Sequence, residues 1–376
     1  MNEKIARFLA DHAPETPCLV VDLDLIGEAY ALLRRYLSSA SIYYAVKANP
    51  AAEIVALLAQ KGANFDVASP AEIALCLGNG ATPERLSFGN TIKKERDIAY
   101  AYAQGLRLFA FDSAGELDKL ARQAPGARVF CRILVSCEGA DWPLSRKFGC
   151  TPEMAVALLR RARELGLDPY GVSFHVGSQQ TDLGQWDRAV GAVARMFTLL
   201  AETDINLRMV NIGGGFPAHY RGEVASVAQY AQAVTDALTR HFGNRLPEII
   251  VEPGRSLVGD AGVIQSEVVL IADKGDGGDK RWVYLDVGKF NGLAETMDES
   301  IKYRIVAPDR SGPLGPVVIA GPTCDSADIL YERTEYRLPL DLDVGDKVEI
   351  LSAGAYTASY ASVGFNGFPP LRTYCV

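Results

Sequence analysis

The sequence lacks the features of several protein classes. Its seven cysteines include no CxxC pair, so we expect reduced thiols in the cytoplasm rather than a disulfide framework. It has no run of about 18 apolar residues, so we expect no membrane span, and its N-terminus has no apolar stretch typical of a signal peptide. The net charge of -8 argues against a nucleic-acid partner. We also expect no metal ion.

The clearest positive feature is a rhythm of short β-rich runs separated by amphipathic helical segments. Alternating strands and helices predict parallel βαβ units, and eight such units close a TIM barrel. A doubly wound open sheet is the alternative, which the lack of an early GxGxxG turn disfavours. The predicted barrel strands are Ser41–Ala48, Ala63–Ser69, Arg85–Asn90, Leu106–Asp112, Arg128–Val135, Tyr170–Val176, Met209–Ile212 and Glu248–Val251.

The pattern changes after about Gly259, where helical periodicity fades and short β-like runs alternate with Gly- and Pro-rich connections. This change predicts a separate mostly-β domain, a sandwich or a barrel. We assign the early run Cys18–Asp22 to the same domain. The expected α/β chain therefore has a (β/α)8 TIM barrel over residues 24–258 and a β-domain formed by residues 1–23 and 259–376.

The predicted strand ends carry chemically active residue types. In a TIM barrel the active site lies at the carboxyl ends of the strands. A purely structural barrel has no reason to gather charged side chains, a histidine and a glycine run there. In chain order these residues are Lys47, Asp66, Asn90, Asp112, Arg132, His175, Gly213–Gly215, Glu252 and Arg255.

Lys47 follows an apolar run, in the stretch YYAVKANP. A lysine at the end of an apolar strand is costly to bury unless its amine is neutralised or paired. A desolvated amine is also a good nucleophile toward aldehydes. The alternative is a surface lysine whose amine reaches water, and the residue by itself does not decide between the two.

The glycine run and the next strand end have the residue types of a site for a phosphate-bearing cofactor. Gly213, Gly214 and Gly215 expose backbone N–H groups and let a phosphate come close, although a tight turn is the simpler interpretation of the glycines alone. Glu252 in EPGR could keep a pyridine nitrogen protonated, and Arg255 could clamp a phosphate. A local ion pair is the alternative, which the glycines one strand earlier disfavour.

Two further residues are candidates for the site because of the residues that flank them in the sequence. His175, in SFHVGSQ, ends the sixth predicted strand, and its flat ring could stack on a flat cofactor. Cys324, in GPTCDSAD of the β-domain, is placed to donate a proton or to act as a nucleophile. Taken alone, the first would be a core histidine and the second a small buried residue, as we interpret the other cysteines.

Together these stretches resemble the eukaryotic-type ornithine decarboxylase family. This family has the alanine-racemase-like fold of pyridoxal 5'-phosphate (PLP) enzymes and includes diaminopimelate and some arginine decarboxylases. The matching stretches run in the family's order from Lys47 to Phe368: YYAVKANP, FDVASPAEI, FHVGSQ, NIGGGFP, EPGR, GPTCDSAD, GAYT and FNGF. The resemblance therefore covers nearly the whole chain and implies PLP as the cofactor.

The resemblance implies roles in cofactor binding. Lys47 would hold PLP through its amine, His175 would stack on the pyridine ring, and Glu252 would pair with the ring nitrogen. Asp66 and Arg132 resemble the polar groups that organise the lysine and the ring. The residues around the phosphate and its clamp would be Gly213, Gly214, Gly215, Gly254, Arg255, Ser178 and Tyr356.

The resemblance also implies a homodimer with two shared active sites. Cys324 would protonate the substrate carbon after carbon dioxide leaves, and Asp325 would bind the distal amine, both in the partner subunit's site. Lys147 and Asp328 match residues that pair across that interface. Phe365, in FNGF, would contact the substrate.

Substrate choice depends on the stretch from Phe290 to Glu299, which resembles the substrate-contacting segment of the family. Thr296 stands where the eukaryotic enzymes carry an aspartate, so Glu295 or Asp298 would substitute; a solvated polar turn is the alternative. The stretch LAETMDESIKY resembles bacterial members that act on ornithine and sometimes on lysine. We therefore expect decarboxylation of L-ornithine to putrescine, and also of L-lysine to cadaverine, in polyamine biosynthesis.

Two kinds of rival function remain. Diaminopimelate or arginine decarboxylase of the same fold is the enzymatic rival, although Cys-Asp rather than Cys-Glu and the FNGF ending speak against the former. The other rival is a catalytically inactive homologue that binds regulators, like the antizyme inhibitors. Such a protein need not keep Lys47, His175, Glu252, Arg255 and Cys324, all of which are present.

Overall fold

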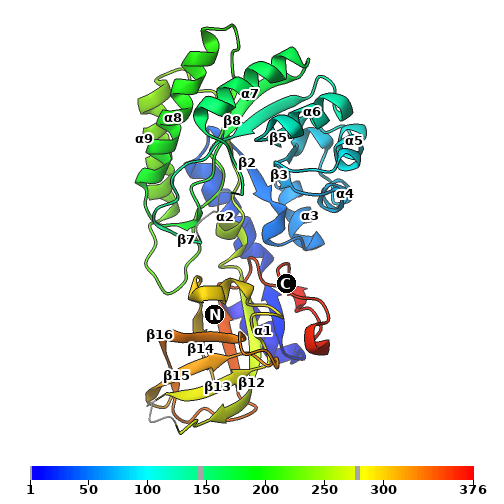
Figure 1. Cartoon of the computed structure of the whole chain (residues 1–376). Coiled ribbons are helices and arrows are strands. Elements are labelled where there is room, and N and C mark those ends of the chain that lie inside the picture. Colours follow the sequence, from blue (N-terminus) through cyan, green and yellow to red (C-terminus); the bar gives the residue numbers. More distant parts are fainter. Residues whose placement is uncertain (1, 143–146, 276–279) are drawn as a thin grey trace. The chain divides into compact units, whose positions relative to one another are not determined.

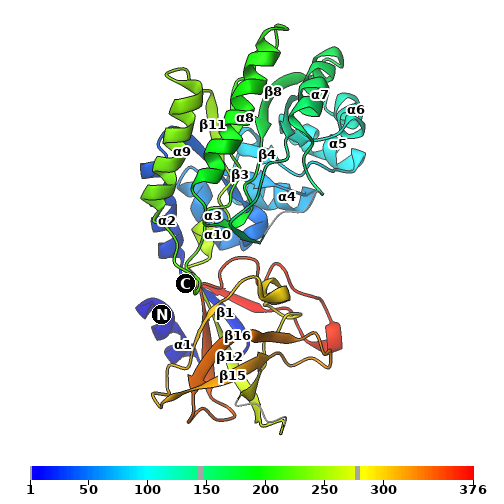
Figure 2. The same cartoon turned by 60° about the vertical axis from the view of Figure 1, so that its left-hand side comes forward.

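The computed structural model describes residues 2–142, 147–275 and 280–376. They form two compact units, which Figure 1 and Figure 2 show from two sides. The barrel unit consists of Gly27–Pro217 and Ala225–Gly254, and the β-rich unit consists of Met1–Ile26, Ala218–Val224 and Arg255–Val376. Arg255 therefore belongs to the β-rich unit although it directly follows the barrel unit in the chain.

Eight parallel strands close a barrel, which confirms the predicted TIM fold. Large apolar side chains from opposite strands, among them Tyr43, Leu108, Phe130 and Met209, form a buried cluster that fills the barrel. In order around the barrel the strands are β2 (Ala40–Ala45), β3 (Asn64–Val67), β4 (Leu86–Phe88), β5 (Leu108–Phe111), β6 (Arg128–Arg132), β8 (Asp168–Ser173), β10 (Met209–Asn211) and β11 (Glu248–Val251).

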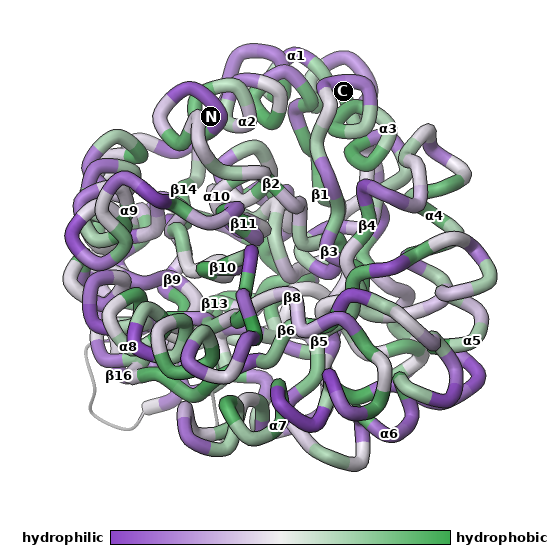
Figure 3. Tube along the Cα trace, turned by 90° about the horizontal axis from the view of Figure 1, so that it is seen from above, coloured by the Kyte–Doolittle hydropathy of each residue, from purple (hydrophilic) through white to green (hydrophobic). Residues whose placement is uncertain are grey.

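Amphipathic helices surround these strands, and Figure 3 shows them as a ring of alternating hydrophobic and hydrophilic segments. Several begin where the sequence offers a cap: the Ser69 and Ser113 hydroxyls accept N–H bonds, and Ser226 forms a capping box with Gln229. The helices are α2 (Leu23–Tyr36), α3 (Ala52–Gln60), α4 (Pro70–Gly78), α5 (Glu95–Ala103), α6 (Ala114–Gln123), α7 (Pro152–Glu164), α8 (Gly184–Ala201) and α9 (Val227–Phe242), with a 3-10 turn η2 (Pro83–Arg85).

The strand that precedes Lys47 is shorter than predicted. It ends at Ala45, and residues Val46–Ala48 form a 3-10 turn (η1) that the bond from Asn49 N–H to the Val46 carbonyl closes at 3.1 Å. The Tyr44 hydroxyl donates to the Asn49 carbonyl at 2.8 Å, which fixes the turn from within the buried core. The predicted strand to Ala48 is therefore wrong at its end, because local hydrogen bonds replace the sheet ladder there.

The seam between β4 and β5 is the weakest in the ladder of the described barrel strands. These two strands pair at a single position, Phe88 opposite Phe109, whereas β5 and β6 pair at four positions. The same three residues of β4, Leu86–Phe88, pair with β3 at all three positions, so the scarcity of ladder pairs is confined to the side of β4 that faces β5. Other contacts must hold this side of the barrel together.

The β-rich unit contains one eight-stranded mixed sheet, which confirms a mostly-β second domain. Helix α1 (Glu3–His12) packs on it through Ile5 and Leu9, which join a buried cluster with Cys18 and Val20, and α1 lies beside β1 in Figure 2. The strands are β1 (Cys18–Val21), β12 (Gly262–Ala272), β13 (Arg281–Leu285), β14 (Arg304–Val306), β15 (Leu314–Ala320), β16 (Ile329–Pro339), β17 (Lys347–Leu351) and β18 (Arg372–Cys375). The remaining elements are α10 (Arg255–Val258), η3 (Ala294–Glu299), η4 (Phe365–Gly367) and, in the barrel unit, a two-stranded antiparallel sheet of β7 (Ala140–Trp142) and β9 (Ser178–Gln180).

A bulge interrupts the pairing of β16 with β15, and Glu299 stabilises it. The register jumps from Tyr336 opposite Val317 to Tyr331 opposite Ile319. Three successive N–H groups, at residues 332, 333 and 334, donate to the Glu299 carboxylate at 2.7 to 2.8 Å. These bonds outweigh burial, which alone would raise the pKa of this carboxyl, and lower the pKa to about 2.

The helices of residues 2–142, 147–275 and 280–376 are each too short or too polar to cross a lipid bilayer. All seven cysteines are free thiols in this structure.

Candidate active site

Lys47 and Asp66 lie at the same end of the barrel. Ala45 and Asp66 are register partners on neighbouring strands, and Lys47 follows two residues later on the η1 turn. The Lys47 charge acts on Asp66, on half-buried Glu72 and on His175, which places the amine among these groups. Lys47 itself is exposed, because the η1 turn carries it out of the apolar strand.

Asp66 is a buried carboxyl with an unmet hydrogen-bonding requirement. Burial raises its pKa well above the usual range and the Glu252 charge adds to this, while Lys47 and Arg132 oppose it. Its Oδ1 atom has no hydrogen-bond partner within the described part of the chain. Gly89 packs so closely that an added Cβ would stand 2.0 Å from this oxygen. The position of Asp66 therefore depends on the backbone that follows β4.

His175 is a neutral ring with a defined tautomer. Burial lowers its pKa well below the usual range, and the charges of Arg132 and Lys47 act in the same direction. The Gly177 N–H donates to His175 Nδ1 at 3.0 Å. A neutral imidazole that accepts at Nδ1 carries its proton on Nε2. An uncharged, flat ring is suited to stacking on an aromatic group.

The Gly213–Gly215 run forms a tight loop at the end of β10. An added Cβ would stand 2.3 Å from the Phe174 carbonyl oxygen at Gly213, 2.5 Å from the Glu252 oxygen at Gly214, and 2.6 Å from the Gly177 oxygen at Gly215. Gly213 and Gly215 also adopt positive φ angles of 68° and 98°. Only glycine meets both requirements, so the loop brings bare backbone to this barrel end.

Asn211 holds the glycine loop and Glu252 together, and sequence reasoning missed it. Its Oδ1 accepts from Gly213 N–H at 2.9 Å, and its Nδ2 donates to Glu252 Oε1. The Glu252 N–H donates in turn to the Gly213 carbonyl at 2.8 Å. Asn211 is fully buried. A polar residue at the last position of an apolar strand was the available signal, in the stretch NIGGGFP.

Arg132 ends β6 with its guanidinium facing the acidic residues. Burial lowers its pKa, which the charges of Glu252, Asp66 and Asp112 counteract. The Phe148 ring lies 5.2 Å from its Cζ atom. Asp112, at the end of β5, accepts from Gly149 N–H at 2.7 Å. The barrel end therefore gathers two cationic side chains, Lys47 and Arg132, and three acidic ones, together with the neutral His175 ring.

Ser178, predicted to lie near a phosphate, begins β9 in the barrel unit and is half-buried. Gly254 is the last residue of the barrel unit. Arg255 and Tyr356 belong to the β-rich unit.

Arg255 is buried and held by a carboxylate and a phenol. Its guanidinium donates to both oxygens of Glu295 at 2.7 Å and to the Tyr220 hydroxyl at 2.6 Å. The Tyr356 ring lies 4.9 Å from its Cζ atom, and Tyr356 has a positive φ of 56°. Burial would lower the pKa of Arg255, but the charges of Tyr220 and Glu295 raise it well above the usual range. The guanidinium is therefore permanently charged and fixed in direction.

This pairing separates the two acids between which the sequence left a choice. Glu295 is 3% exposed and both its oxygens are bound to Arg255. Asp298 is exposed, adopts a positive φ of 53°, and lines a pocket of about 480 Å³ in the β-rich unit. Lys289, Phe290 and Met297 line the same pocket. Asp298 thus lines a cavity, whereas the Glu295 carboxylate is bound by Arg255.

The Cys324 loop presents two exposed functional groups on a fixed turn. Cys324 and Asp325 are both exposed, and the Cys324 N–H donates to Asn366 Oδ1 at 3.0 Å. Buried Asp328 holds the loop by accepting from the Thr323 hydroxyl at 2.7 Å and from the Lys289 N–H at 2.7 Å. These bonds within one chain engage both carboxylate oxygens of Asp328.

The residues predicted to meet a partner differ in their surroundings. Lys147 lies 4.9 Å from the Phe148 ring centroid, and its pairing with a partner's Asp328 stays a prediction. Phe365 is 37% exposed and packs on Phe290 with ring centroids 4.7 Å apart. Val363 nearby is 85% exposed.

Comparison with known proteins places the chain in a family. The family model described as pyridoxal-dependent decarboxylase, pyridoxal binding domain, matches residues 23–259. The chain belongs to this family. The match includes every strand of the barrel, and it confirms the predicted fold, the PLP cofactor and the identity of the protein as a PLP-dependent decarboxylase.

Similar proteins cover nearly the whole chain. A lysine/ornithine decarboxylase of Selenomonas ruminantium is 34% identical over 98% of this chain and 91% of its own length. An antizyme inhibitor 2 of Xenopus laevis is 33% identical over 98% of this chain and 82% of its own length.

Solved structures agree with this placement. A lysine/ornithine decarboxylase of Vibrio vulnificus complexed with cadaverine matches with a TM-score of 0.88 at 30% identity, over 100% of this chain and 98% of that one. The arginine decarboxylase of Paramecium bursaria Chlorella virus matches with a TM-score of 0.90 at 26% identity, over 100% of both chains.

The barrel end fits the cofactor of the family. Asp66 supplies a buried oxygen that lacks a partner in the described chain, His175 supplies a neutral flat ring, and Gly213–Gly215 supply backbone that a side chain would obstruct. Glu252 is held in place by Asn211. An aldehyde-bearing, phosphorylated pyridine would find an amine, an aromatic ring, an acid and closely approachable backbone here.

Proposed function

We propose that the protein decarboxylates L-ornithine to putrescine and L-lysine to cadaverine with PLP. The observation that carries this proposal is the position of Asp298, an exposed carboxylate on a pocket, while Glu295 is bound to Arg255. A substrate with a cationic side-chain end needs a carboxylate with which it can pair. The likeness to lysine/ornithine decarboxylases over nearly the whole chain supports the same substrates.

In this proposal the barrel residues hold the cofactor. Lys47 binds PLP through its amine, His175 stacks on the ring, and Glu252 pairs with the ring nitrogen. Asp66 and Arg132 orient these groups. The phosphate is bound by Gly213, Gly214, Gly215, Gly254, Ser178, Arg255 and Tyr356.

The bound cofactor supplies an electron sink for the electron pair that remains when carbon dioxide leaves. The protein residues set orientation and move protons. Neutral His175 adds no positive charge above the ring, whereas the Glu252 carboxylate favours a protonated ring nitrogen. Cys324 donates the proton that replaces the lost carboxylate on the substrate carbon.

We also propose that the active enzyme is a homodimer in which Cys324, Asp325 and Phe365 complete the partner's site. The exposure of Cys324 and Asp325 supports this, because neither is buried within its own chain. The inactive variant Lys47→Ala and the slowed variant Cys324→Ala would then gain activity when they are mixed. Equal subunit exchange should give about a quarter of wild-type activity, since half of the dimers carry one intact site. A mixture without activity would refute the shared site.

The substrate proposal is tested by measuring carbon dioxide release from ornithine, lysine, arginine and diaminopimelate in parallel. We expect turnover of the first two, and an Asp298→Asn variant should raise KM for both by roughly tenfold, the value of one charge-assisted hydrogen bond. Asp309→Asn, which changes an exposed acid elsewhere in the β-rich unit, is the control. Agmatine from arginine as the main product, or a colourless protein without turnover, would overturn the proposal.

A further inference from the structure

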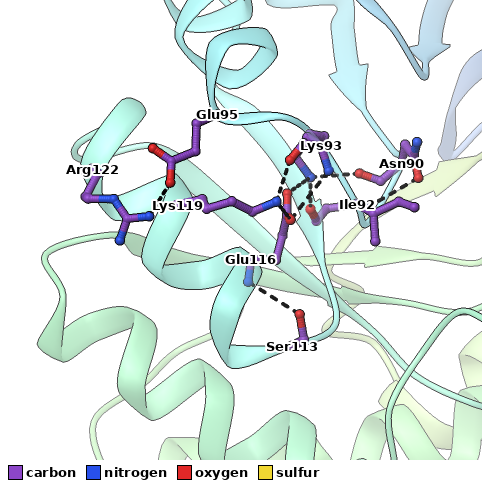
Figure 4. A network of polar contacts seen from close by, with 9 residues as sticks. Asn90, Ile92, Lys93, Glu95, Ser113, Glu116, Lys119 and Arg122 are labelled. Atoms are coloured by element: carbon purple, nitrogen blue, oxygen red, sulfur yellow. Dashed lines mark hydrogen bonds and ion pairs between the residues drawn. The ribbon is translucent and has the colours of Figure 1, made fainter.

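A network of buried charges lies beside the barrel end and has no part in the function proposed above. Figure 4 shows Lys93, which follows β4, meeting Glu116 on α6. The Lys93 side chain is fully buried, and its Nζ lies 2.9 Å from Glu116 Oε1. Glu116 Oε2 in turn lies 2.5 Å from Lys119 Nζ, so one carboxylate faces two cations.

The Lys93 ammonium also donates to two backbone carbonyls on different strands. It reaches the Asn90 oxygen at 2.7 Å, just beyond β4, and the Ala110 oxygen at 2.6 Å, within β5. These are the two strands that pair at the single position Phe88–Phe109. The side chain therefore bridges the seam where ladder hydrogen bonds are scarce.

The bridged backbone leads directly to Asp66. Asn90 follows Gly89, whose missing side chain lets Asp66 Oδ1 lie against the backbone. The Gly89 N–H donates to the Val67 carbonyl at 3.1 Å, so this stretch is tied to β3 on one side and, through Lys93, to β5 on the other. A shift of residues 89–90 would move the wall on which Asp66 rests.

The buried charge of Lys93 is costly for the fold. Burial lowers the pKa of Lys93 to about 8, although Glu116 counteracts the shift. The folded chain thus accommodates the charged form less well than the unfolded chain does, and burying the charge disfavours folding at neutral pH.

We propose that Lys93 is a positioning residue of the decarboxylase, which fixes Asp66 at the cofactor site by clamping the ends of β4 and β5 together. The inference rests on the proposed role of Asp66 in PLP binding. Lys93 touches neither cofactor nor substrate in this scheme and acts through the backbone of residues 89–90.

The test uses the full-length holoenzyme and Lys93→Met, which keeps the length of the side chain and removes its donors. PLP affinity, measured by titrating the apoenzyme with the cofactor, should weaken about tenfold on the folded fraction, with far-ultraviolet circular dichroism unchanged. Lys94→Met, at the exposed neighbouring lysine, should bind PLP like the wild type. Wild-type affinity in folded Lys93→Met would overturn the proposal.

A double-mutant cycle separates positioning from a general loss of structure. Asp66→Asn should itself weaken PLP binding, and adding Lys93→Met should then have little further effect, because both changes disturb the same contact. If the losses of PLP affinity in the two single variants add up in the double variant, the proposed role of Lys93 is overturned while that of Asp66 stands. An Asp66→Asn protein with wild-type PLP affinity would instead refute the proposed role of Asp66. If Lys93→Met does not fold, Glu116→Gln replaces it. This variant should lose less PLP affinity than expected for Lys93→Met, and its loss should likewise not add to that of Asp66→Asn. A loss that adds to that of Asp66→Asn would refute the clamp.

The pH dependence provides a readout that simple destabilisation would not reproduce. The charged groups that face Lys93 are Glu116 and Lys119 on α6 and Asp112 after β5. Burial lowers the pKa of Lys93 to about 8, and the neutral amine has one donor fewer and no charge to attract Glu116, so the affinity ratio between wild type and Lys93→Met should shrink between pH 7 and pH 9. A ratio that stays constant over this range would contradict the clamp.

Discussion

Replacing Glu299 by glutamine should destabilise the β-rich unit by about 3 kcal/mol at pH 7. The carboxylate accepts three N–H bonds from the β16 bulge, and its side chain is 10% exposed, so solvent screens it little. A folded pKa of about 2 against a reference of 4.5 corresponds to about 3 kcal/mol, at roughly 1.4 kcal/mol for each pKa unit. Glutamine keeps one acceptor but turns an NH2 group toward backbone donors.

The folded and reference pKa values of Glu299 also determine how the stability difference between wild type and Glu299→Gln depends on pH. A carboxyl whose folded pKa lies below its unfolded value stabilises the fold fully above the unfolded pKa and loses that effect as pH falls through the folded one. The wild-type advantage should therefore shrink by about 0.8 kcal/mol between pH 7 and pH 4, and by about 2 kcal/mol at pH 3.

Urea denaturation of the full chain at several pH values measures this effect. Near-ultraviolet circular dichroism is a suitable signal, because Tyr331 and Tyr336 flank the bulge with ring centroids 4.2 Å apart. Glu335→Gln, an exposed acid on the same strand, is the matched control and should change stability by less than about 0.5 kcal/mol. A Glu299→Gln variant as stable as this control, or a difference independent of pH, would refute the reasoning.

Three further predictions concern the active site. Lys47→Ala should abolish turnover and the visible absorbance of bound PLP while leaving circular dichroism unchanged; an active, yellow variant would contradict the role of the lysine. Cys324→Ala should slow product formation and alter the product pattern in chromatography, and an unchanged rate and pattern would count against proton donation. Asn211→Ala leaves Glu252 without its amide donor, so PLP should bind about tenfold more weakly. Asn244→Ala, at an exposed site, should bind PLP normally, and equal affinities in the two variants would disprove the role of Asn211.

The barrel was predictable because its strands are short, apolar and regularly spaced. The predicted strand Glu248–Val251 agrees with β11 at both ends. Strand β16 was missed, since YERTEYR carries charges and its bulge breaks the alternation on which strand prediction relies. Strand ends were least certain where a turn takes over the backbone bonds, as at Lys47.

The chemistry of the site was predictable as a set of residue types but not as a set of contacts. Charged residues at successive strand ends indicated a site before any contact was known. The Arg255–Glu295 pair joins residues 40 positions apart, so neither local spacing nor propensity could reveal that Glu295 is already neutralised. Asn211 was overlooked for the same reason, because its two partners are defined only when β10 and β11 lie side by side.

The glycine loop after β10 limits how this enzyme can be redesigned. Each of its three positions has a backbone oxygen within 2.6 Å of where a side chain would begin. Directed evolution should therefore recover almost no tolerated replacements at residues 213–215, whatever amino acid is offered as the new substrate. Libraries aimed at other substrates belong in the Ala294–Glu299 segment, where exposed Met297 and Asp298 can change without disturbing the barrel.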